Sequence, residues 1–186
     1  MNAAAAFVAR WRVRLGYPLA IAVLFFARPT PRSILAGALV GAMGLWLRAF
    51  AAGYLRKQEV LIVTGPYAYT RNPLYLGSAI LTLGAGIAAH SWISAVTLFV
   101  YFALVYFIVM RREEKELHLR HGAAFEEYAR AVPLFIPRLP AAKLAGDSAG
   151  SFSFAQYKKN HEWQAAAGFL FLLFVLQLLW LLRRLH

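Results

Sequence analysis

The sequence lacks cysteine altogether. A disulfide, a thiolate metal site and a cysteine nucleophile each need that side chain, so all three are excluded. Acidic residues are also scarce, with 8 Asp and Glu against 20 Lys and Arg, which gives a formal net charge of +12. The basic residues are spread between apolar runs. They therefore favour contact with anionic lipid headgroups over a nucleic-acid-binding domain.

Apolar residues dominate the composition: 61% of the chain is hydrophobic, and the mean hydropathy is +0.55. Soluble globular proteins have far less apolar residue content. Several segments reach or approach the length that crosses a bilayer core of about 30 Å. They are residues 8–27, 33–55, 74–90, 92–110 and 164–182. The sequence thus predicts an all-α polytopic membrane protein with about five transmembrane helices.

The distribution of Lys and Arg predicts the orientation of these helices. The turn at His90 and Ser91 contains no Lys or Arg, whereas the segment from Arg111 to Lys159 contains nine. Cytoplasmic loops carry the excess of Lys and Arg, so the long segment is predicted to be cytoplasmic. The loop 56–73 is then cytoplasmic too. Arg183 and Arg184, at the far end of the last helix, oppose this rule.

The stretch GPYAYTRNPLYLG, residues 65–77, is polar and conformationally restricted although it lies between apolar segments. One interpretation is structural, with Asn72 capping a helix that starts at Pro73 and tyrosines forming an interfacial belt. The other interpretation is a binding site. A second polar stretch, RREEKELHLRHGAAFEEYARAVPLFIPR from Arg111, favours the site, although its charges could also pair along a surface helix.

Together the two stretches resemble a known family. LIVTGPYAYTRNPLYLG, a helical hairpin and EEKELHLRHGAAFEEYARAVPLFIPR resemble the membrane-integral methyltransferases of the isoprenylcysteine carboxyl methyltransferase and phospholipid methyltransferase group. The resemblance covers about residues 53–138. It implies an enzyme that transfers a methyl group from S-adenosylmethionine to a lipophilic or small membrane-permeant acceptor, at a cytoplasmic site between loop 56–73 and the helical segment after the fourth helix.

The resemblance also implies where the cofactor binds. An ammonium needs a carboxylate, a carboxylate needs N–H donors, and an adenine needs an apolar slot. The implied cofactor contacts are Leu61, Ile62, Tyr67, Asn72, Pro73, Leu74, Tyr75 and Glu113. The candidate catalytic residues are Arg71, Arg112 and Glu114.

This chain departs from the family pattern at the acceptor side. Where the prenylcysteine enzymes have an arginine four positions before the matching glutamate, this chain has Val109, and Asn72 replaces a histidine. Arg111 or Arg112 could substitute from another helical face. The acceptor therefore stays open, with phospholipid amine methylation as one alternative. An NADPH-dependent reductase of the membrane sterol type and a non-enzymatic lipid-binding or packing protein are the others.

The sequence also divides into three predicted parts. Residues 1–138 form the predicted core, residues 139–160 a linker, and residues 161–186 an additional C-terminal transmembrane helix. His118 and His121 have helical spacing for two metal ligands, but no third ligand is evident, so no metal site is predicted. A lipid or lipophilic small molecule is the expected partner, no nucleic acid is expected, and the oligomeric state is not predicted.

Overall fold

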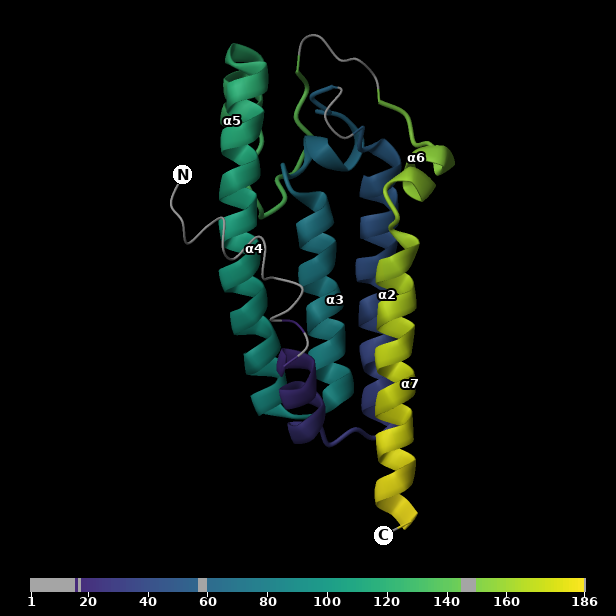
Figure 1. Ribbon diagram of the computed structural model, residues 1–186. Coiled ribbons are helices and arrows are strands. Elements are labelled where there is room, and N and C mark those ends of the chain that lie inside the picture. Colours follow the sequence, from purple (N-terminus) through teal and green to yellow (C-terminus); the bar gives the residue numbers. More distant parts are fainter. Residues whose placement is uncertain (1–15, 17, 57–59, 145–149, 186) are drawn as a thin grey trace.

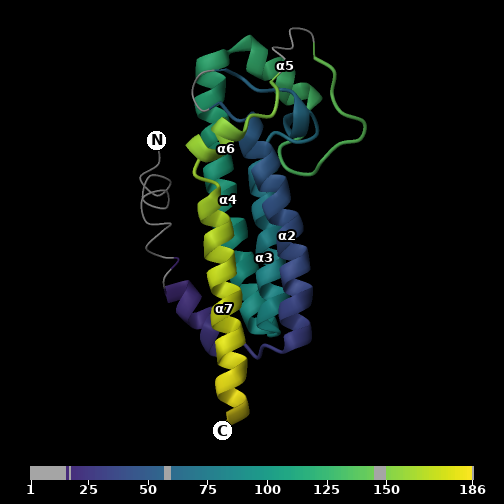
Figure 2. The same ribbon diagram turned by 90° about the vertical axis from the view of Figure 1, so that its right-hand side faces the viewer.

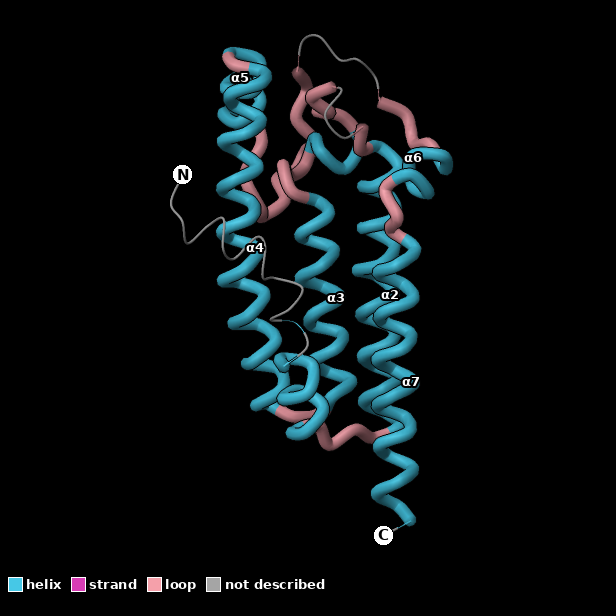
Figure 3. The backbone as a smooth tube through the Cα atoms, viewed as in Figure 1, coloured by secondary structure: helices cyan, strands magenta, loops and turns pink. Residues whose placement is uncertain are grey.

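A computed structural model describes residues 16, 18–56, 60–144 and 150–185. Its long helices α2 (Pro31–Tyr54), α3 (Pro73–Ala89), α4 (Trp92–His121) and α7 (Trp163–Leu185) run side by side as a bundle (Figure 1). Shorter helical pieces are η1 (Gly65–Ala68), α5 (Ala123–Ala131), α6 (Phe154–Lys159) and residues 18–26. The described part of the chain contains no strand (Figure 3).

The prediction of an all-helical membrane protein is confirmed. Three described helices, α2, α4 and α7, are long and apolar enough to cross a membrane, and α3 is a shorter apolar helix of 17 residues. The predicted first span, 8–27, begins outside the described residues. The count of five transmembrane helices therefore stays a prediction.

Local sequence signals set the starts of α2 and α4. Thr30 caps α2 because its hydroxyl accepts from the Ser33 N–H at 3.1 Å, while the Ser33 hydroxyl accepts from the Thr30 N–H at 2.9 Å. Between α3 and α4 the chain reverses through His90, which has a left-handed backbone with φ of 49°. Ser91 then caps α4, since its hydroxyl accepts from the Ser94 N–H at 3.4 Å. The predicted tight hairpin is thus confirmed.

Helices α2 and α3 pack more extensively than any other pair of described elements. Glycines permit this close approach, because a Cβ on Gly84 would lie 2.6 Å from the Gly41 nitrogen and 2.7 Å from the Gly37 oxygen. A Cβ on Gly44 would likewise lie 2.7 Å from the Gly77 oxygen. The pair forms a stiff scaffold that carries the polar loop 61–72 at one end.

Helix α7 lies along α2 and is joined to the bundle by apolar and polar contacts (Figure 2). The Phe169 ring fills the space over Gly41, and Leu176 is fully buried. Near the start of α7, Glu162 forms a bidentate ion pair with Arg48 of α2, with an N–O distance of 2.8 Å. Arg48 therefore anchors the start of α7 to α2.

The segment 139–160, predicted as a linker, contains the short helix α6. At its end, the Asn160 amide nitrogen donates to the carbonyls of Ala52 and Leu55, each at 2.9 Å, and so completes the C-terminal end of α2.

Candidate functional site

The polar loop before α3 is held in place by the segment that follows α4. The Tyr128 hydroxyl of α5 donates to the Tyr67 carbonyl at 2.8 Å. Beyond α5, the N–H groups of Arg138 and Ala142 donate to the carbonyls of Tyr69 and Ala68, each at 2.9 Å. Two stretches far apart in sequence therefore form one structural unit at the end of the bundle.

Asn72 joins this unit in a different way from the predicted cap. It occupies the N-cap position of α3 but makes no side-chain capping hydrogen bond. Its amide nitrogen instead donates to the Leu134 carbonyl at 3.0 Å, and the Thr70 hydroxyl donates to the Phe135 carbonyl at 3.0 Å. Asn72 thus fastens the loop to the segment after α5 and leaves the first N–H groups of α3 without a side-chain cap.

The two glutamates that follow the apolar part of α4 meet the start of α3. The Tyr75 hydroxyl donates to Glu113 at 2.6 Å, and Arg71 forms an ion pair with Glu114 at 2.8 Å. The Arg71 and Glu114 side chains are only 13% and 15% exposed, so solvent screens this pair weakly. Arg111 also contacts Glu114 at 3.1 Å from the exposed side. The helix α4 positions both carboxylates because it continues past residue 110 to His121.

A small cavity of about 90 Å³ lies beside these pairs. Its lining includes Leu61, Ile62 and Tyr67 from the loop, Arg71 before α3, and Tyr128 from α5. Two buried polar atoms here, the Tyr67 hydroxyl oxygen and Arg71 Nε, have no hydrogen-bond partner. Buried polar atoms normally have a hydrogen-bond partner, and these two have none within the protein. They are therefore available to a ligand in the cavity.

Burial also affects the ionisation of the two tyrosines that meet here. It raises the pKa of Tyr67 well above the ordinary 10.0, and the neighbouring Tyr128 and Glu113 act in the same direction. Burial likewise raises the pKa of Tyr128, although the Arg71 charge opposes that shift. Both phenols stay protonated at neutral pH and can donate hydrogen bonds.

The structure brings most of the predicted site residues together. Ile62 and Tyr67 belong to one buried cluster against which Leu74 packs, and Leu61 packs against the neighbouring cluster around Tyr128. Pro73 is fully buried at the start of α3. With Arg71, Asn72, Tyr75, Glu113 and Glu114, these residues surround the end of the bundle where α3 begins.

Arg112 does not join this group. Its side chain is 44% exposed and pairs with Glu116 one turn further along α4, at 2.8 Å. Val109 is buried, with 6% exposure, and Arg71 rather than Arg112 supplies the guanidinium next to Glu114. The guanidinium next to these glutamates therefore comes from the loop and not from α4.

Sequence reasoning missed two basic residues of the cavity, Arg56 and Arg120. Arg120 follows Glu113 by seven positions, which is two helical turns, and this spacing could have indicated a shared face. Arg56 follows the end of α2 and carried no comparable signal. The described residues include no group of three or more His, Cys, Asp or Glu side chains that could hold a metal ion.

The side-chain chemistry of this site fits the charged groups of S-adenosylmethionine. Its cavity of about 90 Å³ is smaller than the 300 to 1,000 Å³ or so of usual small-molecule sites, so the surrounding segments must separate to admit the whole cofactor. Glu113 offers a carboxylate for an ammonium, and the unpaired donors Arg71 Nε and Tyr67 hydroxyl suit an anionic group. Leu61 and Ile62 give the cavity an apolar wall of the kind that a purine ring requires. The orphaned polar atoms are the observation on which this fit rests.

Comparison with known proteins identifies the same region. Residues 32–122 match the family model described as phospholipid methyltransferase. The yeast Schizosaccharomyces pombe has a protein-S-isoprenylcysteine O-methyltransferase that is 34% identical over 86 residues, which is 45% of this chain and 36% of that protein. No solved structure matches the chain.

Two bacterial relatives carry names from metal resistance. The nickel-cobalt-cadmium resistance protein NccN of Alcaligenes xylosoxydans xylosoxydans is 39% identical over 95 residues, 51% of this chain and 43% of that protein. The cobalt-zinc-cadmium resistance protein CzcN of Cupriavidus metallidurans is 34% identical over 116 residues, 62% of this chain and 51% of that protein. The chain thus spans about half or less of the length of these curated relatives.

Proposed function

We propose that this chain, whose residues 32–122 match the phospholipid methyltransferase family model, transfers a methyl group from S-adenosylmethionine to a lipophilic acceptor in the membrane. The observation that carries the proposal is the pairing of Tyr75 with Glu113 and of Arg71 with Glu114 beside a cavity that holds unpaired polar atoms. We further propose that this site faces the cytoplasm, in keeping with the many Lys and Arg between Arg111 and Lys159.

Each residue has a defined task in this proposal. Glu113 binds the cofactor ammonium and is itself oriented by the Tyr75 hydroxyl. Arg71, held by Glu114 and packed 5.9 Å from the Phe125 ring centroid, offers Nε to a carboxylate. The apolar wall of Leu61 and Ile62 excludes water from the cavity. When bound, the cofactor supplies a methyl group on a sulfonium, which makes the leaving group neutral.

Catalysis then depends on positioning more than on covalent chemistry. Methyl transfer is an in-line displacement, and holding two reacting atoms about 3 to 3.5 Å apart in a dry site supplies much of the acceleration. An acceptor carboxylate needs no base. An acceptor amine must lose a proton, and Glu114, a partly buried carboxylate paired with Arg71, is the candidate base.

Two acceptor classes are consistent with the site. The buried Val109 removes the helix arginine of the prenylcysteine enzymes, while Arg71 provides a guanidinium from the loop. The match to the phospholipid methyltransferase model favours a phospholipid amine as the second candidate. Methyl transfer to prenylcysteine and to phosphatidylethanolamine should therefore be assayed in parallel.

The first test is ligand binding by calorimetry to the detergent-purified chain. We expect S-adenosylmethionine and its demethylated product to bind, and Glu113→Gln to weaken both by roughly tenfold or more because a charge-assisted contact is lost. Glu116→Gln is the matched control, since Glu116 lies on the same helix and pairs with Arg112 outside the site. The control should bind both ligands as the unmodified chain does.

The other outcomes discriminate between the alternatives. Binding of NADPH without binding of the sulfonium pair would support a reductase and contradict the proposal. Failure of all three ligands to bind would favour a packing or lipid-binding role. Equal losses in Glu113→Gln and Glu116→Gln would indicate a general effect of charge rather than a specific contact.

A further inference from the structure

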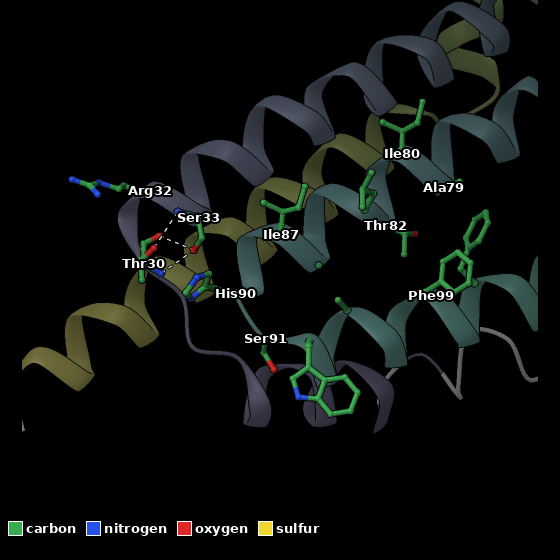
Figure 4. Close-up of a pocket in the computed structure, with 15 residues that line it drawn as sticks. Thr30, Arg32, Ser33, Ala79, Ile80, Thr82, Ile87, His90, Ser91 and Phe99 are labelled. Atoms are coloured by element: carbon green, nitrogen blue, oxygen red, sulfur yellow. Dashed lines mark hydrogen bonds between the residues drawn. The ribbon is translucent and has the colours of Figure 1, made fainter.

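A large apolar cavity lies at the opposite end of the bundle from the proposed methyl-transfer site. It is a groove of about 1030 Å³ between α3 and α4, and Figure 4 shows the residues that line it. Small-molecule sites usually measure about 300 to 1,000 Å³, so this groove is at the upper end of that range. It exists because α3 contacts α4 far less than it contacts α2.

The walls of the groove are apolar over about half the thickness of a bilayer. They run from the hairpin turn at His90 and Ser91 to Phe102. These eleven or so residues of α4 rise about 16 Å, which matches one leaflet of a hydrocarbon core about 30 Å thick. Phe102 closes the groove by stacking on Tyr106, with ring centroids 4.5 Å apart. The groove therefore ends before the Tyr75 and Glu113 pair.

The rim at the hairpin end is polar and basic. Thr30, Ser33, His90 and Ser91 lie together there, and Arg32 extends past the end of the groove, away from the apolar walls (Figure 4). Trp92 is 76% exposed at the same level, as expected of an indole at a membrane interface. The helices α2 and α4 both begin at this rim, so the positive ends of their dipoles face it.

Among the described residues, no Asp or Glu side chain lies near this rim. Residues 1–58 and 60–112 contain no Asp or Glu, and the described acidic side chains belong to the far end of α4, to α5 and to the start of α7. Glu59 and Asp147 lie outside the described residues. Among the other arginines at this end, Arg28 and Arg183 donate to backbone carbonyls and Arg184 lies over Trp180.

Arg32 differs from these arginines. Within the described residues it has no hydrogen bond or ion pair, although it lines the groove rim. An anion for Arg32 must come from outside the described chain, and the apolar walls below it require hydrocarbon. An anionic lipid combines a negatively charged headgroup with a hydrocarbon chain at this depth of a membrane.

We propose that the groove between α3 and α4 binds an anionic phospholipid of the leaflet opposite the methyl-transfer site. Its acyl chain lies along the groove as far as Phe102, and its phosphate contacts Arg32 at the rim. This site is separate from the proposed active site and does not depend on the methyl-transfer proposal. It gives the protein a preference for anionic lipid that acts independently of the acceptor.

Trp92 provides a built-in reporter, because it lines the groove and bromine on an acyl chain quenches indole fluorescence. The full chain is prepared with Trp11, Trp46, Trp163 and Trp180 replaced by Phe. It is then reconstituted in phosphatidylcholine vesicles that contain either dibrominated phosphatidylglycerol or dibrominated phosphatidylcholine. We expect the brominated phosphatidylglycerol to reach half-maximal quenching at a roughly tenfold lower mole fraction, because the phosphate gains a charge-assisted contact.

Two variants assign this preference to the groove. Arg32→Gln should abolish the difference between the lipids, whereas Arg184→Gln, which removes a charge at the same end but away from the groove, should keep it. Ala79→Phe, on the wall of the groove, should reduce quenching by both lipids. Helix content and melting temperature of each variant confirm that it folds.

Three results would overturn the proposal. Equal quenching curves for the two lipids would mean that the groove does not distinguish headgroups. A preference that survives Arg32→Gln would assign headgroup recognition to another residue. Unchanged quenching in Ala79→Phe would mean that the hydrocarbon does not enter the groove, as when another segment of the chain or a second copy covers it.

Discussion

At the residue scale, the unusual feature of the proposed active site is a pair of buried polar atoms without partners. Tyr67 is 7% exposed and its hydroxyl is unsatisfied, while Arg71 is satisfied at one end by Glu114 and unsatisfied at Nε. An unpaired buried donor costs roughly 1 to 3 kcal/mol. Two such donors at one cavity lower the stability of the free protein, and a ligand that accepts from both would recover this cost.

The Tyr67 hydroxyl leads to a prediction about alkaline stability. The folded-state pKa of Tyr67 is raised above 10.0, so its stabilising contribution is present below pH 10.0 and is lost as the pH rises toward the folded pKa. Tyr67→Phe removes this titration and an unsatisfied hydroxyl. We expect the variant to be at least as stable at neutral pH, and to lose less melting temperature than the unmodified chain at about pH 11.

Tyr69→Phe is the control for that measurement. Tyr69 is two positions away, and its side chain is partly exposed at 39%. Its loss of stability at high pH should match that of the unmodified chain. The same alkaline loss in all three proteins would contradict the assigned role of Tyr67.

At the scale of elements, the close contact of α2 with α3 decides whether the site is assembled, because this pair carries the loop 61–72. The glycines at the contact leave no room for a side chain. A methyl group on Gly84 would meet backbone atoms of Gly37 and Gly41 that cannot move without separating the helices.

We therefore expect Gly84→Ala to destabilise the protein by about 1 to 3 kcal/mol, as overpacking of a close contact does. The measurement is chemical or thermal unfolding in detergent micelles. Gly168→Ala is the matched control, since a Cβ there has no atom within 4 Å and alanine is the better helix former. If Gly168→Ala were as destabilising as Gly84→Ala, close packing of α2 on α3 could not be the cause.

The same scale shows how far the sequence determines the structure. Apolar runs, Pro at helix starts and polar turns were sufficient to predict α2, α3, the hairpin and α7 within a few residues, because these signals are local. The length of α4 was not predictable in this way, since its charged second half resembles a separate surface helix. In the structure the helix continues to His121, and its Glu113 and Glu114 contact Tyr75 and Arg71.

The contacts of the candidate site also divide into those that a sequence pattern indicates and those that depend on the packed bundle. A family pattern relates the loop to the glutamates, and the structure pairs Tyr75 with Glu113 and Arg71 with Glu114. That these residues bind a cofactor stays a prediction. The hydrogen bond of Asn72 to Leu134 and the ion pair of Arg48 with Glu162 were not predicted, since each joins residues more than sixty positions apart and no sequence pattern specifies either pairing. Contacts of that kind depend on the packed bundle rather than on nearby sequence.

At the scale of the whole molecule, one ion pair joins the family core to the C-terminal helix. Arg48 is 18% and Glu162 is 11% exposed, and Arg48 also donates to the Ser78 hydroxyl and, at 3.4 Å, to the Leu74 carbonyl of α3. It therefore links three helices. If Arg48 or Glu162 is removed, the remaining charge is left poorly solvated and without a counter-ion, which destabilises the folded protein.

We expect Glu162→Gln to lower the free energy of unfolding by about 3 kcal/mol, because it leaves the Arg48 charge buried without its counter-ion. Replacing both partners, with Arg48→Met and Glu162→Leu, should restore most of the loss. Thermal unfolding of the purified chain measures both. Glu127→Gln serves as the control on an exposed face of α5, and a double variant less stable than Glu162→Gln would exclude an electrostatic origin.

The shortness of α3 has a consequence for the membrane itself. A helix of 17 residues is about 26 Å long, a few ångströms less than a typical hydrocarbon core. A bilayer that meets such hydrophobic mismatch thins locally, and thin membranes accommodate it at lower cost. The start of α3 is thereby drawn toward the level of the acyl chains. A lipid acceptor would meet Tyr75 and Glu113 without being lifted out of its leaflet, and the protein would concentrate where the membrane is thin.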